Sequence, residues 1–153
     1  GVVTSTRADY TFNCNILIKF FPERIASYGL LFILSAILIM HLLVFLGILP
    51  YEMVWGGRLK SRSDMILFES VSLFINALMM SLVLIRAGIW KVKLNILLLK
   101  IAFWIMFAIY TLNTLGNLAS LNAFERNFFT PLTFILAIFS WRLTIFDTSS
   151  NTE

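Results

Sequence analysis

The sequence contains little of the chemistry that metal sites, disulfides and water-facing surfaces require. One cysteine, Cys14, and one histidine, His41, occur in 153 residues. A lone cysteine forms no internal disulfide, and together the two residues supply neither a zinc site nor a haem with two histidine ligands. Charged residues make up only 13% of the chain, about half the share found in soluble domains. We therefore expect no metal, no cofactor and no ordinary soluble surface.

Apolar residues are correspondingly abundant. They make up 59% of the chain, whereas soluble domains contain about 45–50%. A chain this short cannot bury so much apolar surface in water, because small domains have a high ratio of surface to volume. The same abundance excludes intrinsic disorder. The composition predicts an integral membrane protein whose residues 1–153 form one domain.

Four long runs contain no charged residue, namely 25–51, 70–85, 101–124 and 127–141, and each is continuously apolar rather than alternating with a period of two. A membrane-spanning helix needs about 20 such residues, whereas a membrane strand would alternate. The first run is longer than a signal-peptide core and lacks a small-residue cleavage pattern, so we expect it to be retained. The prediction is an all-α, polytopic four-helix transmembrane bundle with a polar tail, Asp147–Glu153. The predicted spans are Ile25–Leu49, Met65–Ile85, Leu94–Leu118 and Phe128–Phe146.

The basic residues are divided unequally between the two sides of these spans. Eight lie on the side of the termini and four on the other side. Because cytoplasmic loops are enriched in Lys and Arg, both termini are expected in the cytoplasm, in a plasma or bacterial inner membrane. The net charge of +4 follows from this bias, and no basic run or recognition motif points to nucleic acid.

Most polar residues inside the predicted spans lie in the non-cytoplasmic half of the bilayer. Glu69 is roughly 6 Å and His41 roughly 12 Å from the non-cytoplasmic ends of their helices, at 1.5 Å per residue. Glu69, Ser72 and Asn76 share one helix face through their i, i+3, i+7 spacing, since helical neighbours recur at three and four residues. Polar stripes in lipid face neighbouring helices. We therefore predict a polar pocket opening away from the cytoplasm, lined by Glu69, His41, Asn76, Tyr110, Asn113 and Asn117.

Each of these polar signals also has a simpler interpretation. Glu69 is shallow enough to reach the membrane interface, and His41 could bond a backbone carbonyl. The asparagines are equally typical of hydrogen bonds that hold membrane helices together.

The first connection, residues 50–64, adds three candidate ligand-binding residues: Glu52, Trp55 and Arg58. A Gly-Gly pair beside Arg58 suggests a hinged lid that binds an anionic group. Alternatively, the segment is an interfacial turn anchored by its aromatic residues. It is no phosphate-binding loop, since the Gly-x-x-x-x-Gly-Lys-Ser/Thr pattern is missing.

Three functions remain open. The first is binding or carrying a small amphipathic or lipidic ligand in the pocket. The second is an intramembrane enzyme, a lipid isomerase or hydrolase in which His41 and Glu69 are the catalytic acid and base. The third is a non-catalytic subunit that packs against a larger membrane complex through the small-residue stripe Thr133, Ala137, Ser140 and Thr144. A homo-oligomer or another membrane protein is the corresponding partner. Membrane lipids are partners in every case.

Overall fold

The computed structural model describes residues 21–51, 61–120 and 122–145. This part of the chain is all-helical. It contains α2 (Glu23–Phe45), α3 (Arg62–Arg86), α4 (Ile96–Leu118), the π-helical turn η3 (Glu125–Phe129) and α5 (Thr130–Thr144). The all-α prediction is confirmed for these residues.

Three of the described helices, α2, α3 and α4, are long and apolar enough to cross a membrane. Their outward faces carry large apolar side chains such as Phe32, Phe74 and Leu112, which water would not favour but lipid would. These features are those of a multi-pass membrane protein.

The fourth predicted span is not confirmed. α5 has 15 residues, which corresponds to roughly 22 Å of helix, less than the roughly 30 Å of a hydrocarbon core. Pro131 has no backbone N–H to donate, which accounts for the π-helical turn immediately before α5. At the other end, Ile145 is extended with φ −88° and ψ 107°, so the helix stops at Thr144.

Two glycines terminate the first two helices in the same way. Gly47 has φ 74° and Gly88 has φ 73°, a left-handed conformation that glycine adopts without strain. After α2, the N–H of Ile48 donates to the carbonyl of Leu43; after α3, that of Ile89 donates to Leu84. This is the Schellman pattern. It ends α2 at Phe45 rather than at the predicted Leu49, and it ends α3 at Arg86, one residue after the predicted Ile85.

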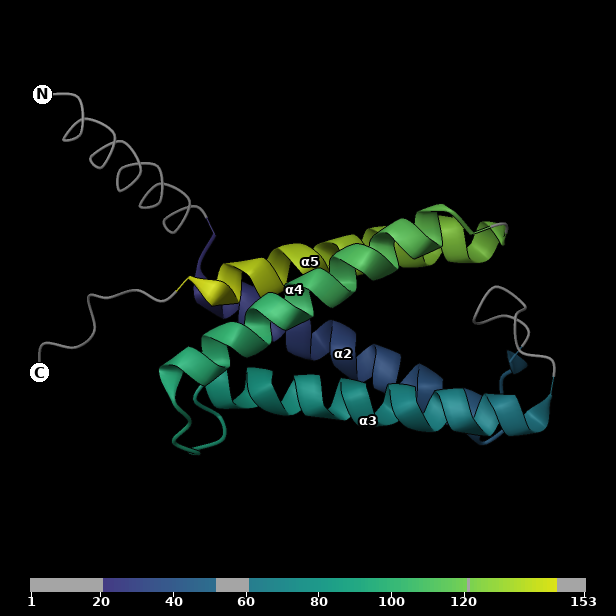
Figure 1. Cartoon of the computed structure of the whole chain (residues 1–153), viewed down its shortest axis with the longest axis horizontal. Coiled ribbons are helices and arrows are strands. Elements are labelled where there is room, and N and C mark those ends of the chain that lie inside the picture. Colours follow the sequence, from purple (N-terminus) through teal and green to yellow (C-terminus); the bar gives the residue numbers. More distant parts are fainter. Residues whose placement is uncertain (1–20, 52–60, 121, 146–153) are drawn as a thin grey trace, which may run out of the picture.

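The helices form two antiparallel hairpins, α2 with α3 and α4 with α5. α2 also packs on α5, whereas α3 and α4 barely touch. In Figure 1 the hairpins lie close together near the end of α3 and the start of α4, and they diverge toward the opposite end. The core fills the close end, with Leu30 and Leu34 of α2, Phe103 of α4 and Leu136 of α5 all fully buried.

The small-residue stripe of α5 faces the chain's own helices. Thr133, Ala137, Ser140 and Thr144 are all at most 7% exposed within the single chain. These four side chains pack against the chain's own helices, so the stripe is not the exposed partner surface that the subunit hypothesis expects.

Gly29 allows α2 to approach α5 closely. A Cβ atom at this position would overlap the ring of Phe139, which itself stacks on Phe21 with ring centroids 5.5 Å apart. Gly29→Ala is therefore expected to lower the free energy of unfolding by about 1–3 kcal/mol, as overpacking does. Gly116→Ala is the matched control, because its Cβ would meet nothing within 4 Å. Thermal unfolding in detergent measures both, and equal stability of the two variants would contradict the close contact.

Candidate functional site

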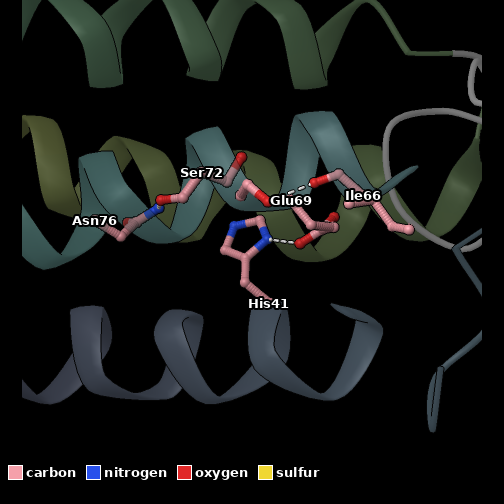
Figure 2. Close-up of polar contacts among 6 residues, drawn as sticks. His41, Ile66, Glu69, Ser72 and Asn76 are labelled. Carbon is pink, nitrogen blue, oxygen red and sulfur yellow. Dashed lines mark hydrogen bonds and ion pairs between the residues drawn. The ribbon is translucent and has the colours of Figure 1, made fainter. Parts of the chain in front are cut away.

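The two candidate acid–base residues meet between α2 and α3. His41 Nδ1 and Glu69 Oε2 lie 2.6 Å apart, and Figure 2 shows the two side chains reaching across the gap between their helices. The His41 side chain is 13% exposed and that of Glu69 is 0% exposed. The predicted approach of His41 and Glu69 is confirmed, and burial excludes the alternative that Glu69 reaches the membrane interface. At this distance the two groups share one short hydrogen bond.

An apolar cluster covers the His41–Glu69 pair on the side nearer the end of α2 and the start of α3. Val44 lies three residues after His41, and Met65 lies four residues before Glu69, so each is one turn nearer the 51–61 connection. Val44 and Met65 are buried, and Met40, Leu49 and Tyr51 pack against them. The carboxylate therefore sits in a poorly hydrated environment, where its bond to His41 is worth more than at a surface.

A cavity of about 350 Å³ lies on the other side of the pair. Residues from α2, α3, α4, η3 and α5 line it, including Ile37, Ile75, Ile109 and Leu136 as part of an apolar wall. Its polar lining consists of His41, Ser72, Asn76, Tyr110, Asn113, Asn117 and Thr133. The sequence placed these side chains in one half of the bundle, and the structure brings them to one cavity.

Glu69 does not itself line the cavity. It lies behind His41, whose second ring nitrogen is on the side of Ser72 and Asn76 in Figure 2. Glu69 can thus act on a cavity ligand only through the imidazole, by fixing its tautomer and orientation. The other candidates, Glu52, Trp55 and Arg58, lie outside the described residues.

Two polar side chains of the cavity wall also join neighbouring helices. Tyr110 Oη donates to Met79 Sδ at 3.0 Å, which links α4 to α3, and Asn117 of α4 reaches Thr133 of α5. Asn76 Nδ2 instead donates to the Ser72 carbonyl at 2.8 Å within α3. The interpretation of the asparagines as helix–helix contacts therefore holds for Asn117, whereas the bond of Asn76 stays within its own helix.

Sequence reasoning missed Thr114, which connects the second hairpin. Thr114 Oγ1 donates to Thr133 Oγ1 at 3.0 Å, and Asn117 Nδ2 donates to the same oxygen at 3.4 Å. The spacing of Tyr110, Thr114 and Asn117 as i, i+4 and i+7 puts them on one helix face, and this spacing could have identified Thr114.

Two arginines near the close end of the bundle were also missed. Arg86 and Glu23 form a bidentate ion pair, with 2.7 Å between Nη1 and Oε1 and 2.8 Å between Nη2 and Oε2. Arg142 is only 2% exposed, and its Nε donates to the Phe21 carbonyl at 2.6 Å. Both contacts fix the start of α2 against a helix end, so we assign them to packing.

Within the described residues, no group of three or more His, Cys, Asp or Glu side chains could hold a metal ion. Comparison of the chain with protein-family models, with curated proteins and with solved structures finds no match. The proposed function therefore rests on the geometry of the cavity.

Proposed function

We propose that this protein binds a small, neutral, amphipathic molecule within the membrane, in the cavity between its two helical hairpins. The observation that carries the proposal is the composition of the cavity wall. Amide and hydroxyl groups from α3, α4 and α5 converge with His41 on one space that is otherwise apolar. Ligand sites characteristically combine a mostly apolar wall with a few converging polar groups.

The charge of the wall favours a neutral ligand. Among the residues that the structure describes, no Lys, Arg, Asp or Glu lines the cavity, and the charge that His41 can carry is balanced by Glu69. A phosphate or ammonium group would enter without a counterion, and burying an unpaired charge is costly. Hydroxyl, ester or amide groups of a ligand would instead match Ser72, Asn76 and Asn113.

The size and position of the cavity favour a lipidic molecule. A volume of about 350 Å³ is at the small end of the range for ligand pockets, roughly 300–1,000 Å³. We place the entrance for a ligand from the lipid phase between α3 and α4, because these two helices make few contacts with each other. A monoacylglycerol headgroup with part of its chain, or a sterol end, suits these dimensions.

Substitutions at two serines of α3 test the proposal. Ser72 lines the cavity, whereas Ser70 is exposed and bonds only the Ile66 carbonyl of its own helix. Ser72→Leu is expected to abolish thermal stabilisation by monoolein or cholesterol, because it fills the cavity and removes a hydroxyl. Ser70→Leu is expected to keep the wild-type response.

The measurement is the shift in melting temperature of the purified chain across a panel of neutral lipids and sterols. No shift with any member of the panel in the wild type, or equal shifts in both variants, would count against binding in this cavity.

A second function, an intramembrane lipid hydrolase or isomerase, is favoured by the His41–Glu69 pair. A buried carboxylate bonded to Nδ1 leaves the other imidazole nitrogen toward the cavity, the arrangement that a general base requires. No nucleophilic side chain is needed if the imidazole activates water. We rank this function second because the polar groups that surround His41 in the cavity wall suit the binding of a ligand equally well without a reaction.

We also propose an orientation of the chain in the membrane. With eight basic residues against four, both termini lie in the cytoplasm of a plasma or bacterial inner membrane. The cavity then lies in the half of the bilayer distant from the cytoplasm.

A further inference from the structure

A second cavity, of about 490 Å³, lies at the close end of the bundle, away from the ligand cavity. The first two turns of α2 contribute Glu23, Arg24, Ser27 and Tyr28, and the end of α3 contributes Arg86 and Ala87. If α2 and α3 cross the membrane, these residues lie at the level of the lipid headgroups on the side of the termini. Nothing in the proposed ligand site accounts for this polar space.

The wall of the second cavity has an excess of one positive charge. Arg86 and Glu23 neutralise each other in a bidentate ion pair, and their side chains are 16% and 27% exposed, respectively. Of the wall residues within ranges 21–51, 61–120 and 122–145, Arg24 is the remaining charged one. A single anionic group would balance it, and a guanidinium suits phosphate oxygens in geometry as well as charge.

Ser27 supplies an independent indication of a ligand. It is 2% exposed, it lines the cavity, and its Oγ has no hydrogen-bond partner among the described parts of the chain. Ser35, Ser70 and Ser81 each donate to the carbonyl four residues earlier in their helices. Buried hydroxyls without a partner are uncommon and call for a specific explanation. Ser140 also lacks a partner but lies in neither cavity wall, so Ser27 is distinguished by its position beside Arg24.

We propose that this second cavity binds the phosphate group of an anionic phospholipid. Arg24 pairs with the phosphate, the Ser27 hydroxyl donates to one of its oxygens, and Glu23 holds the Arg86 guanidinium as one wall of the site. Tyr28, 59% exposed in the same wall, is of the residue type that anchors proteins at membrane interfaces. The phosphate is placed at the positive end of the α2 dipole, which adds to the attraction. This proposal uses the membrane placement of α2 and α3 but is independent of what the first cavity binds.

The test is the affinity of the full chain for phosphatidylglycerol, measured by titration into neutral-lipid nanodiscs with native mass spectrometry. Arg24→Gln is expected to weaken binding about tenfold or more, since an ion-assisted contact to phosphate is lost. Ser27→Ala is expected to weaken it several-fold with the fold intact. Lys91→Gln removes the same charge from an exposed position near that end of α3, outside the cavity wall, and is expected to bind as the wild type does.

Further arms of the titration identify the source of the phosphate. Phosphatidylcholine is expected to bind more weakly than phosphatidylglycerol, and inorganic phosphate is expected not to displace the lipid. Displacement by inorganic phosphate would overturn the assignment to a lipid in favour of a soluble ligand. Equal losses of lipid affinity in Arg24→Gln and Lys91→Gln would show that diffuse surface charge, and not this cavity, attracts the lipid. Wild-type affinity in both Arg24→Gln and Ser27→Ala would overturn the proposed site.

Discussion

Replacing His41 by alanine is expected to lower the free energy of unfolding by about 3–5 kcal/mol. Glu69 is fully buried, and His41 is its partner from α2, with 2.6 Å between Nδ1 and Oε2. Removing one member of a buried pair leaves the other desolvated without the contact that compensated it, and costs of this size are usual. The loss should exceed the roughly 1 kcal/mol of an ordinary hydrogen bond.

The double variant His41→Leu/Glu69→Leu is expected to recover most of that loss. Replacing a buried pair by apolar side chains of similar volume is often neutral or stabilising. Leu42→Ala is the control, because Leu42 follows His41 on α2 and is 47% exposed on the outer face. Equilibrium unfolding in mixed micelles, followed by circular dichroism, gives all four free energies. If His41→Ala unfolds as easily as Leu42→Ala, the pair contributes little to the fold.

Glu69→Gln is expected to separate binding from catalysis by the size of its effect. Glutamine keeps the shape of the side chain but removes its charge and adds two donors. Because Glu69 lies behind His41 and outside the cavity wall, it acts as a positioning residue in either function. For a binding protein, affinity for monoolein should change by about tenfold or less, equivalent to one altered hydrogen bond.

For an enzyme, the same substitution should reduce the rate of monoolein hydrolysis by roughly 10²–10⁴ while binding persists, as expected on losing general-base assistance. The two measurements are the dissociation constant and the turnover rate of one protein preparation. Turnover that is present in the wild type and unchanged in Glu69→Gln would exclude the pair as the catalytic base. Turnover that is lost in the variant would make the enzyme the primary function.

The helices were predictable because the signal for a membrane helix is long and simple. Charge-free runs located α2, α3 and α4 to within about four residues at each end, as is usual for boundaries drawn from sequence. The end of α2 was placed too late because hydrophobicity continues through Ile48 and Leu49, whereas the chain turns at Gly47. The length of α5 was overestimated for a similar reason, since apolar residues precede Pro131 without forming α-helix.

The face of each helix was predictable, but its neighbours were not. Periodicity put Asn76 beside Ser72 and Asn113 beside Tyr110, and those side chains do line one cavity. It could not show that Glu69 lies behind His41, because that depends on how far α2 and α3 are rotated about their axes. Nor could it show that Arg142 is buried, since its partner, the Phe21 carbonyl, is 121 residues away in the sequence.

The most direct test of the proposed ligand cavity, which we place in the membrane half distant from the cytoplasm, is the reactivity of cysteines placed on α4, because the polar groups of its wall would hold water in the absence of a ligand. Asn113 lines the cavity, whereas its neighbour Leu112 is 67% exposed on the outer face. Each is replaced by cysteine in a Cys14→Ser background, and a charged thiol reagent is added to either side of sealed vesicles. Only a hydrated thiol ionises and reacts readily. We expect the cysteine at position 113 to react from the non-cytoplasmic side at least about tenfold faster than the one at position 112, and monoolein to slow the reaction. Equal, slow reaction of both cysteines would show that no hydrated cavity exists, and reaction of position 113 from the cytoplasmic side alone would contradict the proposed orientation.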